Sequence, residues 1–72
     1  MLNISNLKRY RLSHNFTQQK LSELVNISKS HYQSIEYGII SPSVELAIKL
    51  STVLDTSVEE LFDMDTKKEM LV

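Results

Sequence analysis

Residues 17–38 constrain the fold most, because they hold two short helical patterns joined by a break of three residues. The first pattern begins at Thr17, whose hydroxyl can accept a hydrogen bond from a backbone N–H two or three residues further on. Its apolar residues recur at helical spacing on one face: Leu21, Leu24 and Val25. Asn26 ends this helix, because asparagine adopts the left-handed conformation more readily than most residues with a side chain. We therefore expect a sharp turn between two helices.

The second pattern runs from Ser28 to Tyr37 and is closed by Gly38, the only glycine in the chain. Its inner face, which would pack on the preceding helix, comprises Tyr32, Ile35 and Glu36. The opposite face is small and polar and carries no large aliphatic side chain: Lys29, Ser30, Gln33, Ser34 and Tyr37. A helix with such an outward face is suited to insertion into a partner molecule.

Around these residues, over about residues 7–62, the chain resembles the Cro/CI-type helix-turn-helix family, also called lambda-repressor-like or Xre. The residues that carry the resemblance are Arg11, Thr17, Gln18, Ile27, Ser28, Ile35, Glu36, Gly38, Pro42, Ser43, Ser57, Glu60, Leu61 and Phe62. The chain departs from the family pattern at four positions: Asn15, Ser22, Asn26 and Tyr32. The resemblance implies an all-α, compact five-helix lambda-repressor-like DNA-binding domain whose second and third helices form the helix-turn-helix.

The rest of the sequence predicts three further helices. The first spans about residues 4–14, and its inner face comprises Leu7, Tyr10, Arg11 and His14. The fourth begins near residues 41–43, where a proline is well tolerated, and runs to Leu54. Ser57 and Glu60 form a capping box for a short fifth helix. We assign residues 1–62 to one DNA-binding domain and residues 63–72 to a short charged C-terminal tail, for which we predict no conformation.

The net charge of −1 is unevenly divided along the 72 residues. Residues 1–37 carry five lysines or arginines against two glutamates, giving +3, whereas residues 38–72 carry three lysines against seven acidic residues, giving −4. The basic half holds the helix-turn-helix, and an acidic opposite side would help orient the domain towards a polyanion. Chance clustering in a short chain is the alternative interpretation.

Composition argues against several other classes of protein. A chain of this length forms one small domain, and without cysteine it has neither a disulfide nor a thiolate zinc site. The sequence holds no apolar run long enough to span a membrane and no secretion signal, so we expect a cytoplasmic location. His14 and His31 have no second ligand at metal spacing, and no catalytic motif is present. We expect no metal, no cofactor and no enzymatic activity.

The helix predicted to end at Leu54 is apolar on more sides than one burying surface requires. One stripe comprises Val44, Ala47, Leu50 and Leu54. Three further apolar residues lie off that stripe: Leu46, Ile48 and Val53. A helix that is apolar most of the way round needs a second burying surface, and a homodimer interface at these three residues would supply it. The alternative is that they pack under the tail of the same chain.

The resemblance also implies roles for individual residues. Arg11 and Glu36 would form an ion pair that fixes the pose of the helix at 28–37, although Arg11 could instead contact a phosphate. Lys29, Ser30 and Ser34 fall on the family's base-reading positions, and Gln33 lies beside them. Contacts to the DNA phosphates are expected from four residues: Thr17, Gln18, His31 and Tyr37. For the outward face of the helix at 28–37, the alternative is that it is simply solvated.

These inferences favour a sequence-specific transcriptional regulator, most simply a repressor, that binds double-stranded DNA with the helix at 28–37 in the major groove. A homodimer would read a pseudo-palindrome whose half-sites lie about 34 Å apart. The main alternative is a protein-interaction module, such as an antitoxin-like or adaptor subunit, that binds another protein through the apolar helix ending at Leu54. RNA binding ranks below both, because the A-form major groove is too narrow for a helix.

Overall fold

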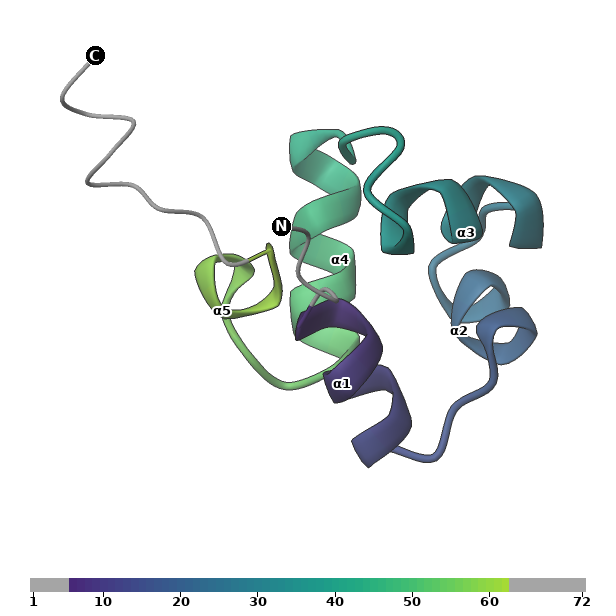
Figure 1. Cartoon of the computed structure of the whole chain (residues 1–72). Helices are drawn as coiled ribbons and strands as arrows, with labels where there is room; N and C mark the ends of the chain where they lie inside the picture. The colour runs from purple at the N-terminus through teal and green to yellow at the C-terminus, as the bar shows by residue number, and fades with distance from the viewer. Residues whose placement is uncertain (1–5, 63–72) are drawn as a thin grey trace, which may run out of the picture.

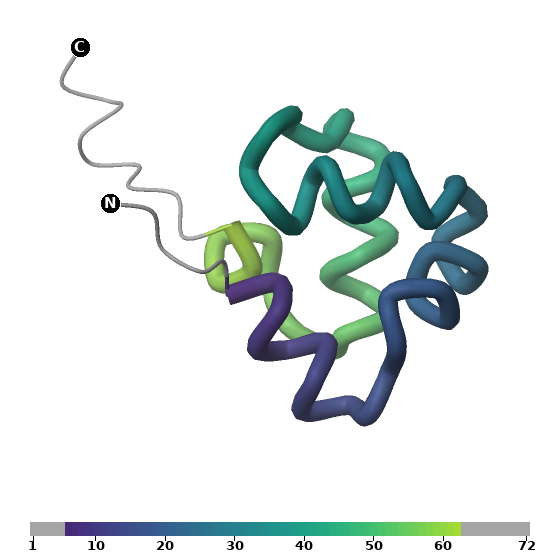
Figure 2. Tube along the Cα trace, turned by 45° about the vertical axis from the view of Figure 1, so that its right-hand side comes forward, coloured from purple at the N-terminus to yellow at the C-terminus, as the bar shows by residue number. Residues whose placement is uncertain are grey.

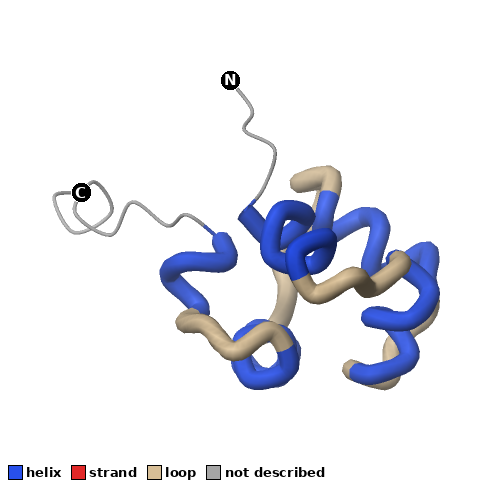
Figure 3. The backbone as a smooth tube through the Cα atoms, turned by 90° about the horizontal axis from the view of Figure 1, so that it is seen from below, coloured by secondary structure: helices blue, strands red, loops and turns tan. Residues whose placement is uncertain are grey.

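The structure is a computed structural model that describes residues 6–62, and this part of the chain is all-α. Its five helices are α1 (Asn6–Ser13), α2 (Gln18–Leu24), α3 (Lys29–Glu36), α4 (Val44–Val53) and α5 (Val58–Phe62) (Figure 1). Short loops join them, and no strand occurs between residues 6 and 62 (Figure 3). The five-helix fold predicted from the sequence is therefore confirmed. The predicted tail at 63–72 and residues 1–5 lie outside the described residues.

Hydroxyl side chains begin four of the helices. In each case the hydroxyl oxygen accepts from a backbone N–H three residues on, at 2.9–3.1 Å: Thr17 from Lys20, Ser28 from His31, Ser43 from Leu46 and Ser57 from Glu60. Each such cap stabilises a helix by about 1 kcal/mol, because it satisfies a donor that has no partner within the helix. The capping roles predicted for Thr17 and Ser57 are confirmed.

Left-handed residues end the first four helices in the same way. Asn15, Asn26, Gly38 and Asp55 have φ values of 60°, 61°, 79° and 55°, and each lies two residues beyond the end of its helix. The next N–H then bonds back to a carbonyl five residues earlier, as in Ile27 to Ser22 at 3.0 Å and Ile39 to Ser34 at 2.8 Å. This pattern is the Schellman motif. The predicted left-handed turn at Asn26 is confirmed, whereas the sequence analysis did not anticipate Asp55.

A single core joins all five helices. Its buried members are Leu7, Leu21, Val25, Tyr32, Ile35, Leu46, Leu50, Leu54 and Leu61. In Figures 1 and 2, α4 runs through the middle of the domain, with α2 on one side and α5 on the other. The helix α2 packs against α3, and α5 packs against both α1 and α4. The helix-turn-helix is therefore at one side of the molecule, and α5 is at the opposite side.

The buried face of α4 differs from the predicted stripe. Val44 is 77% exposed, whereas Leu46 is 7% exposed and belongs to the core. At 3.6 residues per turn, Leu46 lies about 40° around the helix from the fully buried Leu50, whereas Val44 lies about 120° away. The prediction that Leu46 contributes to a dimer interface is therefore wrong, and Val53 is partly buried against the same core. Of the three predicted interface residues, Ile48 alone is largely exposed, at 53%.

Two polar contacts tie α1 to α5. The Asn6 side chain donates to the carbonyl oxygen of Glu60 at 2.7 Å, and the Tyr10 hydroxyl donates to the Glu60 carboxylate at 3.3 Å. In the capping box predicted from the sequence, this carboxylate would instead accept a hydrogen bond from the backbone N–H of Ser57. Glu60 therefore connects two helices that are distant in sequence, through both its carbonyl oxygen and its carboxylate.

Candidate nucleic-acid interface

The helix α3 has one buried face and one accessible face. Tyr32, Ile35 and Glu36 are at most 5% exposed, as the periodicity predicts. On the other face, Lys29, Ser30 and His31 are exposed at the start of the helix, and Tyr37 is 59% exposed at its end. Gln33 and Ser34 are half-buried between them. The four base-reading candidates therefore share one accessible side of α3.

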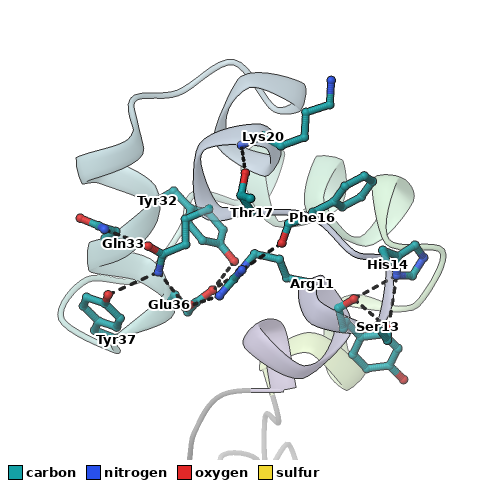
Figure 4. A network of polar contacts seen from close by, with 12 residues as sticks. Arg11, Ser13, His14, Phe16, Thr17, Lys20, Tyr32, Gln33, Glu36 and Tyr37 are labelled. Carbon is teal, nitrogen blue, oxygen red and sulfur yellow. Dashed lines mark hydrogen bonds and ion pairs between the residues drawn. The ribbon is translucent and has the colours of Figure 1, made fainter.

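A buried ion pair holds α3 against α1. The Arg11 guanidinium donates from Nε to Glu36 Oε1 at 2.8 Å and from Nη2 to Glu36 Oε2 at 3.2 Å. Its third nitrogen, Nη1, donates to the carbonyl oxygen of Phe16 at 3.0 Å. Both partners of the pair are buried. The two-point contact fixes the rotation of α3 about its own axis, and therefore which residues it turns outward (Figure 4).

Tyr32 belongs to the same network, a role that the sequence analysis missed. Its hydroxyl donates to Glu36 Oε1 at 2.6 Å (Figure 4). Tyr32 departs from the family pattern that the sequence resembles, and its hydroxyl finds a partner one helical turn away. The i, i+4 spacing of Tyr32 and Glu36 is the signal that could have revealed the contact. Within residues 6–62, every buried side-chain nitrogen or oxygen has a hydrogen-bond partner.

The ionisation of the network follows from these contacts. Burial raises the pKa of Glu36, but hydrogen bonds from Arg11, Tyr32 and Gln18 more than offset it and leave that pKa below its usual value. Burial, together with the hydrogen bond to Glu36, raises the pKa of Tyr32. The hydrogen bond to Glu36 also raises the pKa of Arg11. At neutral pH the network therefore consists of one cation, one carboxylate and one neutral phenol.

Gln18 connects this buried network to the accessible face of α3. Its Nε2 donates to Glu36 Oε2 at 3.0 Å and to the Tyr37 hydroxyl at 3.3 Å. Its Oε1 accepts from Gln33 Nε2 at 2.9 Å. The sequence predicts only a phosphate contact for Gln18, and its link to Gln33 could not be predicted because the two residues lie fifteen positions apart. The structure brings Gln18, Gln33, Glu36 and Tyr37 together.

The remaining predicted contacts lie around the same face. Thr17 accepts the capping hydrogen bond from Lys20, and a hydroxyl in that role keeps its own hydrogen as a donor. Lys20 and Lys29 are exposed on α2 and α3. Glu59 and Glu60 are exposed on α5, and this helix lies across α4 from α2 (Figure 2). Among the described residues, the accessible face of α3 carries Lys29 and no carboxylate, so this face is suited to an anion.

A second surface feature is an apolar groove of about 550 Å³ beside the end of α3. It lies between the loop before α4, the first turns of α4 itself, and α5, where Val58 and Phe62 contribute. Four large apolar residues at or near it are exposed by 43–77%: Ile39, Ile40, Val44 and Ile48. The sequence predicts an interface role for Ile48, but it gives no signal for Ile39 and Ile40, because they fall in a loop with no periodic pattern.

Two further observations concern the described residues alone. Between residues 6 and 62, no three His, Asp or Glu side chains come together as a metal site requires. No helix in this part of the chain has the length and apolar character needed to cross a membrane.

Two short helices joined by a tight turn, the second with an accessible polar face, define a helix-turn-helix DNA-binding domain. A family model described as helix-turn-helix matches residues 7–61. The chain therefore belongs to the helix-turn-helix family of the Cro/CI (Xre) type, whose members are DNA-binding transcriptional regulators.

Individual relatives agree with this assignment. An uncharacterized HTH-type transcriptional regulator of Methanocaldococcus jannaschii, MJ0272, is 36% identical over 56 residues, covering 78% of this chain and 85% of the relative. The HTH-type transcriptional regulator SinR of Bacillus subtilis is 36% identical over 58 residues, covering 79% of this chain but 52% of SinR. A solved structure of the SinR protein/SinI protein complex superposes with a TM-score of 0.73 at 33% identity, covering 92% of this chain and 70% of the other.

Proposed function

We propose that this protein is a sequence-specific regulator of transcription that places α3 in the major groove of DNA. The observation that carries the proposal is the contrast between the two faces of α3. Arg11 and Glu36 fix its inner face, and the outer face offers short or hydrogen-bonding side chains. A helix that is rigidly held, and whose outer face carries no bulky aliphatic side chain, can approach base edges closely.

Base contacts are assigned to four residues on α3. Lys29 would donate to guanine O6 and N7, and Gln33 would pair with adenine N6 and N7. Ser30 and Ser34 are short enough to allow close approach and to bond either type of edge. Thr17, His31 and Tyr37 would hold the phosphates and so set the register without reading the sequence. Because the Gln18 amide already donates to Glu36 and Tyr37, its phosphate contact would come from the backbone N–H of the first turn of α2.

We further propose that two copies bind as a homodimer at the apolar groove. Support comes from the exposed side chains of Ile40, Val44 and Ile48, which would be buried by a second copy. Because the groove adjoins Gly38, an interface there would set the distance between two α3 helices, about 34 Å for half-sites one turn apart. Such a dimer would repress transcription, since blocking a promoter requires only DNA binding. It would act in the cytoplasm.

A second candidate function is a protein-interaction module, such as an antitoxin-like or adaptor subunit. The same groove favours it, because an apolar surface of this kind also suits another protein. The superposed SinR structure is that of a complex with the SinI protein. In this case the groove would bind another protein rather than a second copy.

Selection of bound sequences from a random pool of duplex DNA tests the main proposal. We expect the wild-type protein to enrich a pseudo-palindromic consensus. Lys29→Ala should change that consensus, whereas Lys49→Ala, which removes the same charge from the exposed surface of α4, should leave it unchanged. A wild-type protein that enriches no sequence would overturn the regulator proposal and favour the interaction module.

A further inference from the structure

We infer that Gln18 and Gln33 form one reading unit, in which Gln18 positions the Gln33 amide and thereby influences base preference without touching a base. The inference rests on the proposed function, since it assigns a second residue to the reading done by α3. Its basis is the continuous hydrogen-bonded path from the buried Glu36 carboxylate through Gln18 to Gln33.

The direction of this path is set at its buried end. An ionised carboxylate only accepts hydrogen bonds, and that of Glu36 accepts from Arg11, Tyr32 and Gln18. If the Gln18 amide were turned over, its oxygen would face the carboxylate oxygen at 3.0 Å and place two acceptors in contact. Gln18 must therefore present its NH₂ group to Glu36.

Each later orientation follows from the first. With its NH₂ group facing Glu36, Gln18 directs its Oε1 to Gln33. Gln33 must therefore donate from its Nε2, which lies 2.9 Å from Gln18 Oε1. The two hydrogens of the Gln18 amide are directed to Glu36 and to the Tyr37 hydroxyl. An amide orientation is ordinarily ambiguous, but here the donors and acceptors of the network decide it.

This polarity determines what the accessible face offers to DNA. One hydrogen of the Gln33 NH₂ group is held by Gln18, so the second hydrogen and the carbonyl oxygen remain, in a fixed order. Adenine matches that order, because its N6 donates and its N7 accepts, whereas guanine presents two acceptors. The Tyr37 hydroxyl accepts from Gln18, so its own hydrogen is free to point to a phosphate oxygen.

Removing the Gln18 amide should release Gln33 while leaving it able to reach the DNA. Ordering a flexible side chain on binding lowers affinity by roughly 2- to 12-fold, so we expect a loss of this size at the base pair opposite Gln33. Other base pairs should keep their preferences. A residue that merely contacts a phosphate would weaken all sequences by one common factor instead.

The test compares Gln18→Met, Gln33→Ala and the double variant, with duplexes carrying each single-base change in the wild-type consensus. Gln19→Met is the matched control, because Gln19 bonds Glu23 on α2 and takes no part in the path to Gln33. We expect both single variants to reduce preference at the same base pair, and the double variant to be no worse there than Gln33→Ala. Gln18→Ala repeats the test should Gln18→Met fold poorly.

Nuclear magnetic resonance of the free protein supplies a readout that does not depend on DNA. The side-chain NH₂ signals of Gln33 should show restricted motion in wild type and in Gln19→Met, and free motion in Gln18→Met. A uniform loss of affinity for Gln18→Met, or Gln33 signals that do not change, would overturn the reading unit while leaving the regulator proposal intact. A wild-type protein with no sequence preference would overturn both.

Discussion

Glu36 illustrates how one buried carboxylate controls a surface some distance away. It holds Arg11 on α1, Tyr32 on its own helix and Gln18 on α2, so three helices meet at one group. A buried ion pair often adds little net stability, because its charges lose their hydration. Its clearest effect is to fix geometry, in this case the face that α3 turns outward.

The free energy of unfolding should depend on pH through the ionisation of Glu36. Its lowered native pKa means that it stabilises the fold above the usual carboxyl pKa near 4.3, and that this contribution is lost as the pH falls through the native pKa. Glu36→Gln should therefore lower the free energy of unfolding by about 3–5 kcal/mol at pH 7. The gap to wild type should narrow in acid. Urea titrations between pH 7 and pH 3 would test this, and a gap that stays constant would contradict it.

Asn26 offers a second test at the scale of one residue. Its φ of 61° is strained for a residue with a side chain, although less so for asparagine than for others. Asn26→Gly should raise the free energy of unfolding by roughly 0.5 kcal/mol, because relief of strain exceeds the added flexibility of the unfolded chain. Asn26→Ala should lower it by about 1 kcal/mol. Thermal melting would decide, and a lower midpoint for the glycine variant would refute the account.

At the scale of the helix, local chemistry made the boundaries predictable. Thr17, Ser28 and Ser57 can each satisfy a backbone donor at a helix start, and Asn26 tolerates the turn that ends α2. These interactions involve residues three to five apart, so the sequence contains them directly. The left-handed Asp55 was not foreseen, because aspartate adopts that conformation less often than asparagine or glycine.

The helix faces were predictable only where the period was unambiguous. On α3 the inner and outer residues differ sharply in polarity, and the buried face is the one that the sequence predicts. On α4 six of the ten residues are apolar and they occur on several sides of the helix, so their spacing does not show which side faces the core, and Leu46 is buried rather than exposed as predicted. The groove at Ile40 and the Gln18–Gln33 contact depend on elements that meet only after folding.

Two substitutions on α4 separate its buried and exposed sides. Leu46→Glu places a charge in the core and should unfold the domain at room temperature. Ile48 is exposed, so Ile48→Glu should leave the helical signal unchanged. It should convert a dimer to a monomer, because it places a charge in the proposed interface. Circular dichroism and analytical sedimentation would check both outcomes. A wild-type protein that is already monomeric at micromolar concentration would count against the homodimer and favour another protein as the occupant of the groove.

Across the whole molecule, charge separates along the chain while the net charge stays near zero. Residues 1–37 carry +3 and residues 38–72 carry −4. The exposed lysines of α2 and α3 and the acidic residues of α5 lie at opposite sides of α4 (Figure 1). Repulsion between the phosphates and the acidic residues of α5 favours approach through α2 and α3, and the exposed Lys8 and Arg9 on the neighbouring α1 offset part of this repulsion.

DNA binding should accordingly weaken with salt. Each phosphate neutralised contributes about −0.9 to the slope of log affinity against log salt, so a dimer with several contacts should show a slope of a few units. Fluorescence anisotropy between 50 and 300 mM salt would measure it. Lys20→Ala should make the slope shallower, while Lys49→Ala serves as the charge-matched control. Affinity that does not change with salt would be incompatible with phosphate contacts of this kind.

If α3 reads the base sequence, substitutions on its accessible face must change which bases are preferred. The decisive measurement is the binding of Lys29→Ala and Ser34→Ala to duplexes that carry each single-base change in the consensus. Each variant should lose preference at one or two positions per half-site, by about 1–3 kcal/mol for each good base contact removed. Preferences elsewhere, and all preferences of Lys49→Ala, should match wild type. If both α3 variants instead bind every duplex more weakly by one common factor, or bind as wild type does, then α3 is not the element that reads the DNA.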